Sequence, residues 1–440
     1  MSTYIGKFNW VTQFVACAIF LAMTSTAFGQ FGTVNQIGGV LIDGEGVLTE
    51  ATQRLLDKTT QEIRDSLEGL ADSAREASEL RAISVRSIEK ALADSANNGI
   101  ELTDAMRYMA GIQRIKYVIV KPEINDILLV GPGEGWKVDA KGNVVGESTG
   151  RPVIRLEDFI VAVRTADAAN RGQGVSVSID PTQQGDRQLK QLFRQQSFSP
   201  QMVQQVEQAM GPQDITLTGV AADSRIAQVL VAADYRMKRM AMGFENSATQ
   251  GIPSVLELAQ KAGKGFKQNP RFWLECKYDS VKRSDDYNVW EISGAGAKAL
   301  TDTDAHPLAH KWAENMTEHF AALADADPIF AELQNVMDLS VVAAIFRKYD
   351  LAVAAGLEMP TVAGENDKLE MPEWSVPETV STQCSFVRIK NTYMVTASGG
   401  VQINSWGVLE DVAVEDSITS VAAAVSSKAA EDKIWWNAMN

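Results

Sequence analysis

The sequence predicts an α+β protein in which N-terminal amphipathic helices precede a mixed body of β-hairpins and helices. Three observations indicate this class. Apolar residues recur at helical spacing near the N-terminus, apolar runs of strand length flank polar turns farther along, and helix-like segments separate those runs. The apolar content of 45% and the charged content of 22% are ordinary for a globular protein, which excludes a wholly disordered chain.

The first 29 residues have the pattern of a secretory signal peptide. Lys7 precedes an apolar run from Trp10 to Met23, and small and polar residues follow as far as Gly29. The run is shorter than the ~20 residues that span a membrane, and a retained N-terminal anchor is the alternative interpretation. We expect residues 1–29 to be a signal peptide cleaved after Gly29, which predicts an exported protein in the periplasm or outside the cell.

The formal net charge of −15 predicts an acidic surface. Such a surface repels the phosphates of nucleic acids and anionic lipids, so we expect no nucleic-acid partner. Acidity is also the ordinary way in which an exported protein stays soluble. No other apolar run approaches membrane length, so the sequence predicts no transmembrane span once the signal peptide is removed.

The segment 48–112 is predicted to be a helical module. Apolar residues recur every seven positions from Leu56 to Ala77, and polar residues occupy the other faces. Ser84 is a candidate N-cap for a second helix that runs to Ala96. We expect two amphipathic helices, covering Leu48 to Asn97, that pack on the body; a coiled coil with another chain is the sharper alternative.

The segment 113–167 is predicted to be a small α+β unit rich in hairpins. Residues 115–120 and 127–130 are strand-like and flank the turn at Asn125-Asp126, which predicts a hairpin. A second hairpin is expected over 137–145 and a helix over 156–164. Residues 168–200 are rich in Gln, Gly and Ser, which indicates a linker-like stretch with one strand at 175–179.

An α+β unit at 201–357, a Pro/Glu-rich connector at 358–377 and a C-terminal β-hairpin and tail at 378–440 complete a chain of two or three domains. The expected elements are a helix at 200–210, a strand at 215–218, a helix at 225–244, strands over 271–292 around a turn at 284–288, helices over 307–349 broken at Asp327-Pro328, and strands at 385–390 and 392–398.

The chain has three histidines, and all lie between His306 and His319. A helix that begins at Pro307 places His310 and Glu314 on one face, with His306 just before it. Imidazoles and a carboxylate at this spacing suit zinc, so these three residues are the candidate ligands of a metal-dependent hydrolase. The alternatives are a solvated helix face and a capping role for His306, because the sequence contains no HExxH motif.

Other motifs point to turns and aromatic surfaces. The run Gly131–Gly135 contains three glycines but no Lys-Ser/Thr pair follows it, so it predicts a tight turn that places Trp136. No GxSxG motif is present, so the sequence gives no sign of a serine nucleophile. Trp136 and the pair Trp435-Trp436 are candidate ligand-facing aromatics; the alternative for the pair is burial by a folded-back tail.

Cys276 and Cys384 remain after removal of the signal peptide, and both lie in strand-like runs. In an oxidising compartment they can form one disulfide. The bond would close a long loop, worth roughly 4 kcal/mol in the chain-entropy model. Two buried free thiols are the alternative.

Four runs carry a resemblance to a known family: RIKYVIVKPEINDILLVGPGEGW, VLVAADYRMKRMAMGFE, FAELQNVMDLSVVAAIFRK and TQCSFVRIKNTYMVTASGGVQINSW. The chain resembles a family of exported planctomycete proteins known only as a domain of unknown function, from about Leu48 to the C-terminus. The resemblance implies a secreted or envelope protein and assigns no catalytic residues.

The first functional hypothesis is a non-catalytic envelope or extracellular protein that binds other proteins or assembles with its own copies. The export signal, the amphipathic helices and the terminal Trp pair motivate it. The alternative is the metal-dependent hydrolase that uses His306 and His310, and a small-ligand or glycan binder centred on Trp136 or Trp435 is the third.

Overall fold

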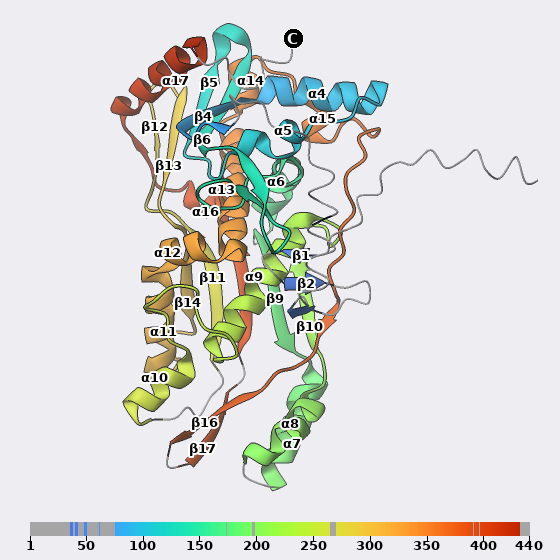
Figure 1. Cartoon of the computed structure of the whole chain (residues 1–440), viewed down its shortest axis with the longest axis vertical. Helices are drawn as coiled ribbons and strands as arrows, with labels where there is room; N and C mark the ends of the chain where they lie inside the picture. The colour runs from blue at the N-terminus through green and yellow to red at the C-terminus, as the bar shows by residue number, and fades with distance from the viewer. Residues whose placement is uncertain are drawn as a thin grey trace, which may run out of the picture. The chain divides into compact units, whose positions relative to one another are not determined.

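Two mixed sheets, each drawing strands from distant parts of the sequence, organise the described residues of this computed structural model (Figure 1). The described residues group into one compact unit. The fold is α+β, as predicted. The structure describes residues 36–37, 40–42, 48–50, 61, 75–172, 174–195, 199–264, 270–389, 391–395 and 397–431.

The first sheet has the strand order β14-β11-β18-β9-β10-β15. The β11–β18 pair is parallel and the other pairs are antiparallel. Its strands come from the stretches 168–200, 201–357 and 378–440, although sequence composition predicts that these stretches are separate units. Its strands are β9 (Val175–Pro181), β10 (Gln213–Thr218), β11 (Arg271–Lys277), β14 (Gly296–Thr301), β15 (Thr379–Val380) and β18 (Ser398–Ile403).

Strand alternation and two glycines explain the middle of this sheet. In β9 the side chains of Val175, Val177 and Ile179 are buried and the serines between them are half-exposed, as the period of two requires. In β18 a Cβ on Gly399 would lie 1.8 Å from the Phe272 carbonyl oxygen, and one on Gly400 would lie 1.9 Å from that of Val177. Glycine therefore allows the neighbouring strands to approach β18.

The second sheet has the strand order β19-β12-β13-β5-β6-β4, with only the β12–β19 pair parallel among the described strands. It contains both hairpins expected at 115–130 and around the turn at 284–288. Its strands are β4 (Ser78–Ser84), β5 (Tyr117–Lys121), β6 (Asp126–Gly133), β12 (Ser280–Arg283), β13 (Val289–Ser293) and β19 (Val412–Val414). The expected hairpin over 137–145 is β7 (Trp136–Val138) with β8 (Val144–Gly146).

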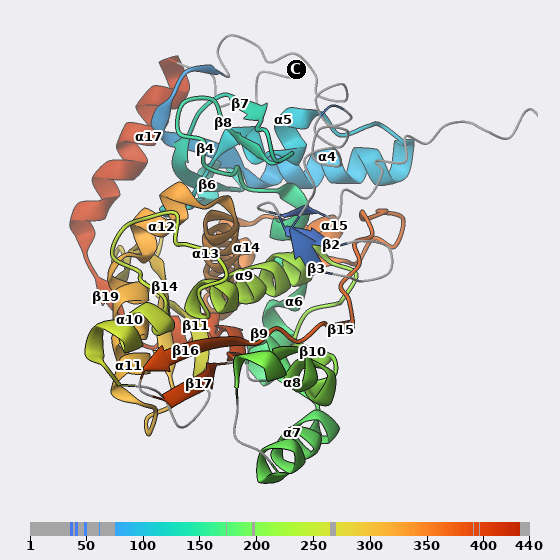
Figure 2. The same ribbon diagram turned by 60° about the horizontal axis from the view of Figure 1, so that its bottom comes forward.

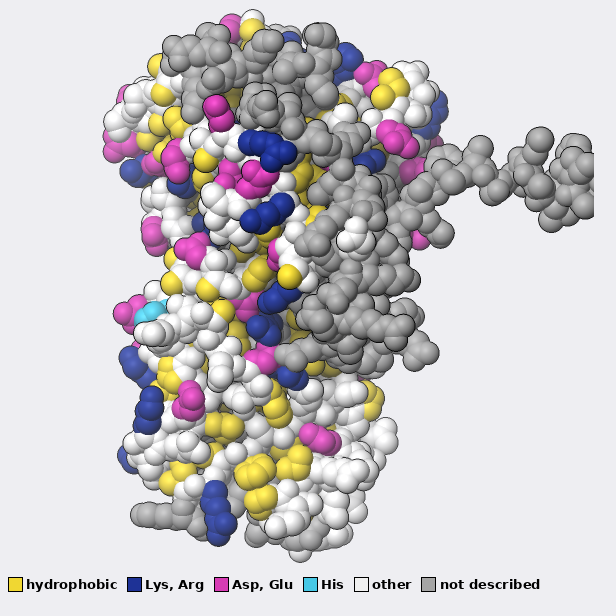
Figure 3. Space-filling model, viewed as in Figure 1, with side chains coloured by type: hydrophobic (Ala, Val, Ile, Leu, Met, Phe, Trp, Pro, Cys, Tyr) yellow, Lys and Arg dark blue, Asp and Glu magenta, His cyan; other side chains and the backbone are white. Residues whose placement is uncertain are grey.

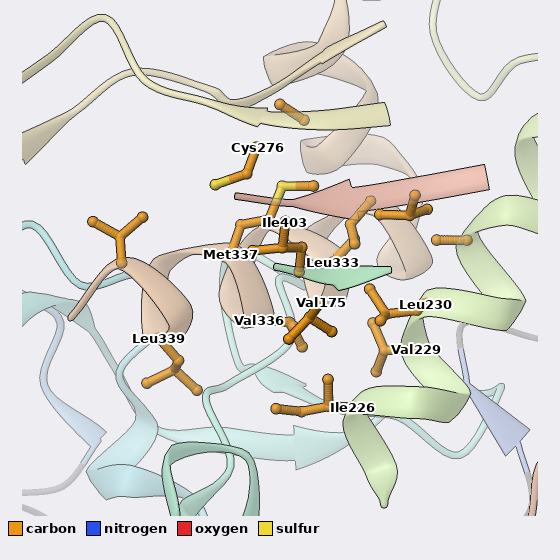
Figure 4. Packing of buried hydrophobic residues seen from close by; sticks show 14 of the residues in the cluster. Val175, Ile226, Val229, Leu230, Cys276, Leu333, Val336, Met337, Leu339 and Ile403 are labelled. Atoms are coloured by element: carbon orange, nitrogen blue, oxygen red, sulfur yellow. The ribbon is translucent and has the colours of Figure 1, made fainter. Parts of the chain in front are cut away.

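Three helices fill the core between and beside the sheets: α6 (Leu156–Arg171), α9 (Arg225–Ala241) and α13 (Pro328–Lys348). Figures 1 and 2 both place α13 between the two sheets, and α13 packs against α6 and α9 while α9 packs on β9 and β18. Figure 4 shows aliphatic side chains of α9 and α13 meeting those of the first sheet, among them Leu230, Leu333 and Val175.

The core helix α13 is long and apolar enough to cross a membrane by length and composition. Within the described residues, however, 94% of that apolar stretch is buried inside the protein. Asp327 caps the helix by accepting a hydrogen bond from the Ile329 N–H, and Pro328 occupies its first turn, so the predicted break at Asp327-Pro328 is confirmed. The helix is apolar on all sides because other elements surround it.

The helical prediction for Leu48 to Asn97 is confirmed for its second helix, from Val85 to Asn97, and is wrong at two strands. Ser84 caps helix α4 (Val85–Asn98) through a hydrogen bond from the Ser87 N–H, as expected. Residues Ser78–Ser84, in contrast, form β4 because pairing with β6 and burial of Ile83 outweigh the helical periodicity. Leu48–Glu50 form the short strand β3. The heptad residues at 51–60 and 62–74 lie outside the described residues.

Several elements complete the fold. The stretch 168–200 contributes both β9 and helix α7 (Gln183–Gln195), and the connector 358–377 contains α15 (Pro360–Ala363). The other elements are β1 (Gln36–Ile37), β2 (Val40–Ile42), α5 (Asp104–Arg107), η1 (Met109–Gly111), η2 (Pro122–Ile124), η3 (Pro200–Met202), α8 (Val203–Met210), α10 (Val255–Ala262), α11 (Pro307–Glu318), α12 (Phe320–Ala326), α14 (Leu351–Ala355), β16 (Ser385–Ile389), β17 (Asn391–Val395), α16 (Ser405–Val408), η4 (Asp416–Ile418) and α17 (Thr419–Glu431).

Charged side chains of both signs are interspersed over the described surface that Figure 3 shows. Acidic side chains exceed basic ones in the whole chain, 56 to 41.

Candidate functional site

A pocket of about 360 Å³ opens where α6, the loop before α9 and an extended segment of the connector meet. The extended segment, residues 371–376, is called the strap, and the cavity is called the strap pocket. The pocket is lined by Glu157, Val161, Arg164 and Thr165 of α6, by Ala221, Asp223, Ser224 and Arg225 before and at the start of α9, and by Met371, Pro372, Glu373 and Trp374 of the strap.

Local sequence explains each wall of the strap pocket. The four α6 residues are spaced at helical intervals, so one face of α6 forms a wall. Ser224 is the N-cap of α9, since its side chain accepts a hydrogen bond from the Ala227 N–H. Pro372 and Pro377 flank the middle of the strap, which has no regular secondary structure.

Trp374 fastens the strap across the pocket. Its indole Nε1 donates to Glu157 Oε2 at 2.8 Å, and its backbone N–H donates to the Asp223 carbonyl oxygen at 2.9 Å. One residue farther on, the Gln228 side-chain amide donates to the Ser375 carbonyl oxygen at 2.6 Å. The half-buried indole ring is thereby fixed as part of the pocket wall.

Arg225 lies at one wall of the pocket and ties three helices together. Its guanidinium pairs with Asp158 of α6 and with Glu332 of α13, the latter at 2.6 Å. Arg225 is only 3% exposed, and Asp158 and Glu332 are equally buried. The two carboxylates hold the pKa of Arg225 above its ordinary value although burial acts against them, so the cation persists in the interior.

The buried cluster contains one carboxylate more than it has cations. Asp158 Oδ1 is buried and has no hydrogen-bond partner among the described residues. Burial raises the pKa of Asp158 to about 7; Arg225 opposes the shift, and the carboxylates of Glu157 and Glu332 add to it. Asp158 is therefore the group in this cluster that takes up a proton near neutral pH.

Arg164 links the pocket to α15. Its Nε and Nη2 donate to the carbonyl oxygens of Val362 and Thr361 at 3.2 and 2.9 Å. The N–H groups of the same two residues donate to the Glu89 carboxylate, each at 2.9 Å. The chain that enters the strap is therefore anchored from both α4 and α6.

A second buried charge fixes α9 to the first sheet. Lys238 donates to Asp234 Oδ2 at 2.8 Å, to the Ile179 carbonyl oxygen at 2.8 Å and to the Gly399 carbonyl oxygen at 3.1 Å. Burial lowers the pKa of Lys238, and Asp234 opposes that shift. The three ammonium donors are all occupied, so Lys238 holds the helix in place.

The structure does not assemble the histidines into a metal site. His306 caps α11, because its Nδ1 accepts a hydrogen bond from the Leu308 N–H at 3.2 Å. Glu314 is exposed and pairs with Lys311. Within the part of the chain that the structure describes, no group of three or more His, Cys, Asp or Glu side chains is placed to hold a metal ion. The capping alternative is therefore correct for His306, and the solvated-face alternative is correct for Glu314. Among the described residues, His310 is not part of a group that could hold a metal ion.

The predicted disulfide between Cys276 and Cys384 is wrong, since both residues are free thiols. Cys276 lies in the main core with β11 (Figure 4), whereas Cys384 packs in a separate cluster with Leu189 and Val206 of the helices α7 and α8. Burial raises the pKa of Cys384 to about 12 and raises that of Cys276 as well, so both thiols stay protonated.

Trp136 is a core residue, so its assignment as a ligand-facing aromatic is wrong. It is 3% exposed and its ring centroid lies 6.1 Å from that of Tyr108. The predicted tight turn over Gly131–Gly135 is wrong for its first three residues, which belong to strand β6; only Glu134 and Gly135 separate β6 from β7, and Glu134 accepts hydrogen bonds from Ser148, Thr149 and Gln113. Trp435 and Trp436 lie outside the described residues.

Sequence reasoning missed Trp374, the tryptophan that does line a pocket. It lies in the stretch Met371-Pro-Glu-Trp-Ser-Val-Pro377, whose composition indicates a connector. The sequence did contain one signal for this site, namely a single large aromatic residue in a polar segment flanked by prolines. Such a side chain usually packs against another part of the protein.

A family model described as a protein of unknown function (DUF1598) matches residues 177–255. The match begins in β9, contains α7, α8, β10 and α9, and ends at the start of α10. It includes the run VLVAADYRMKRMAMGFE and supplies the α9 wall of the strap pocket, Arg225 among its residues. Neither the curated proteins nor the solved structures contain a significant match. The comparison supports a domain of unknown function and gives no activity.

We expect the free energy of unfolding to depend on pH through the Asp158 carboxyl group. Its pKa is raised from 3.8 to about 7 on folding, so the stability linked to it is complete below about pH 4 and is lost as the pH rises through 7. The free energy of unfolding should therefore fall more steeply from pH 5 to pH 8 in the wild type than in Asp158→Asn. Urea denaturation at each pH measures this free energy for both proteins. Asp223→Asn, at an exposed site, should keep the wild-type slope; an unchanged slope in Asp158→Asn would contradict the assignment.

Proposed function

We propose that this chain is an exported, non-catalytic binding protein that takes a small organic ligand into the strap pocket. The observation that supports the proposal best is the pocket itself, whose volume falls in the range of small-molecule sites. Its walls combine apolar surface from Val161, Met371 and Trp374 with a few fixed polar groups. Such a combination orients a ligand and encloses its apolar part.

Ser224 and Arg225, two of the polar lining residues, are engaged in structural bonds, which favours binding over catalysis. The Ser224 hydroxyl donates to the Ala221 carbonyl oxygen at 2.7 Å and caps α9. The Arg225 guanidinium is held by two carboxylates. No histidine is among the lining residues that the structure describes, and the Ser224 hydroxyl donates to a backbone carbonyl oxygen and not to a base.

The place of action and the partners are part of the proposal. The signal-like residues 1–29 support export to the periplasm or the extracellular space. We further propose that the chain works with protein partners of the envelope or with its own copies and does not bind nucleic acid, because acidic groups predominate.

Export predicts a processed N-terminus. The mature protein from its native host should begin at Gln30, because cleavage is expected after Gly29. N-terminal sequencing and intact mass of the protein from the soluble exported fraction measure this. Recovery of an unprocessed chain from the cytoplasm would contradict the proposed location.

Trp374→Ala should weaken ligand binding by the pocket, because it removes the aromatic wall. The probes are phenethylamine, 2-phenylethanol and phenylacetate, which share a skeleton and differ in charge. A ligand of this size binds a matched pocket with a Kd on the order of 1 mM. Saturation-transfer NMR on the wild type should detect binding of at least one probe, and Trp374→Ala should raise its Kd about tenfold or more.

Trp406→Ala is the matched control for Trp374→Ala. Trp406 is also half-buried, and its Nε1 donates to the Ala166 carbonyl oxygen of α6 at 3.0 Å, but it does not line the pocket. This variant should bind like the wild type. Absence of binding of all three probes to the wild type, or an equal loss in both variants, would count against the proposed function.

A further inference from the structure

We propose that the strap pocket selects an organic cation, namely an ammonium group carried on an apolar body. This inference rests on the proposed function, since it names the class of ligand for the same pocket. Three independent features lead to it: the balance of charge on the walls, the occupation of the arginine donors, and the placement of Trp374 beside a carboxylate.

Acidic groups outnumber basic ones on the walls. The lining carboxylates are Glu157, Asp223 and Glu373, and the lining cations are Arg164 and Arg225. Behind the wall, Arg225 already faces the buried carboxylates of Asp158 and Glu332 and thus adds no net positive charge. The potential in the pocket is therefore negative, which favours a cation.

The two arginines offer little to an anion. Arg225 points its two terminal nitrogens at Asp158 and Glu332. Arg164 uses Nε and Nη2 on the carbonyl oxygens of Val362 and Thr361. A carboxylate or phosphate in the pocket would therefore meet acidic side chains without the paired N–H donors that such groups need.

Trp374 and Glu157 form the recognition element. The Trp374 Nε1–H donates to Glu157 Oε2, which fixes a half-buried indole ring next to a carboxylate. An ammonium over an indole gains cation–π attraction, and the adjacent carboxylate adds Coulomb attraction. Arg225 Cζ lies 6.0 Å from the ring centroid, but its charge is balanced by Asp158 and Glu332. Met371 and Val161 supply the apolar surface for the rest of the ligand.

The expected selectivity is a cation over its neutral counterpart. Phenethylamine should bind the wild type with a Kd at least tenfold below that of 2-phenylethanol, and phenylacetate should bind more weakly than both. Raising the NaCl concentration from 20 to 300 mM should weaken phenethylamine binding severalfold, because salt screens the charges, and should leave 2-phenylethanol unchanged.

Glu157→Gln tests the recognition element, because glutamine keeps an oxygen acceptor for the Trp374 indole and removes the charge. Its Kd for phenethylamine should rise about fivefold while that for 2-phenylethanol stays the same. Glu370→Gln is the matched control, since Glu370 is exposed just before the strap and does not line the pocket. Thermal unfolding verifies that each variant is folded; if Glu157→Gln is not, the three probes on the wild type decide.

The outcomes separate the inference from the proposed function. A clear preference for phenethylamine that depends on Glu157 supports the inference. Equal binding of the amine and the alcohol, or tightest binding of phenylacetate, overturns the cation inference and leaves the binding function intact. No binding of any probe to the wild type overturns both.

Discussion

One buried guanidinium determines how the helices of this protein meet. Arg225 begins α9, and it pairs with Asp158 in the first turn of α6 and with Glu332 in α13. All three groups are almost fully buried, so removing Arg225 leaves two carboxylates in the interior without their cation. Breaking a buried pair in this way costs about 3–5 kcal/mol. The directions of α6 and α9, and so two walls of the strap pocket, depend on this interaction.

The other end of α9 is fixed by a second buried cation. Lys238 binds two carbonyl oxygens of the first sheet together with Asp234 of its own helix. The helix is thus tied to neighbouring helices at one end and to the sheet farther along. The strap, in contrast, is held by a few bonds centred on Trp374. Two walls of the pocket are thus fixed to the core by buried charges, and the third is held across the pocket by Trp374.

Local patterns in the sequence predicted much of the fold and little of the site. The hairpins, the cap at Ser84 and the break at Asp327-Pro328 follow from signals a few residues long, and they are present. Strand β4 was missed because its pairing with β6 is a long-range interaction that the helical periodicity of its own residues conceals. Spacing along the chain likewise says nothing about which cluster a cysteine joins, so the disulfide prediction for Cys276 and Cys384 failed.

The pocket was beyond sequence reasoning for the same reason. Glu157, Arg225 and Trp374 come from three distant segments, and none belongs to a short motif with a known chemistry. The three histidines are close in sequence, which suggested a metal site. In the structure His306 caps α11, and the described residues contain no group of three or more side chains placed to hold a metal ion. Buried charge pairs such as Arg225 with Glu332 cannot be recognised from the neighbouring sequence, because a charged residue in a helix usually lies on the solvated face.

A double-mutant cycle between Arg225 and Glu332 is the most direct test of the central claim. The free energy of unfolding would be measured for the wild type, Arg225→Gln, Glu332→Gln and the double variant. The exposed pair Lys90–Asp94 provides the control cycle. We expect a coupling energy of about 2 kcal/mol or more for the buried pair, against about 0.5 kcal/mol or less for the surface pair. A buried coupling no larger than the surface value would contradict the view that Arg225 holds the helices together.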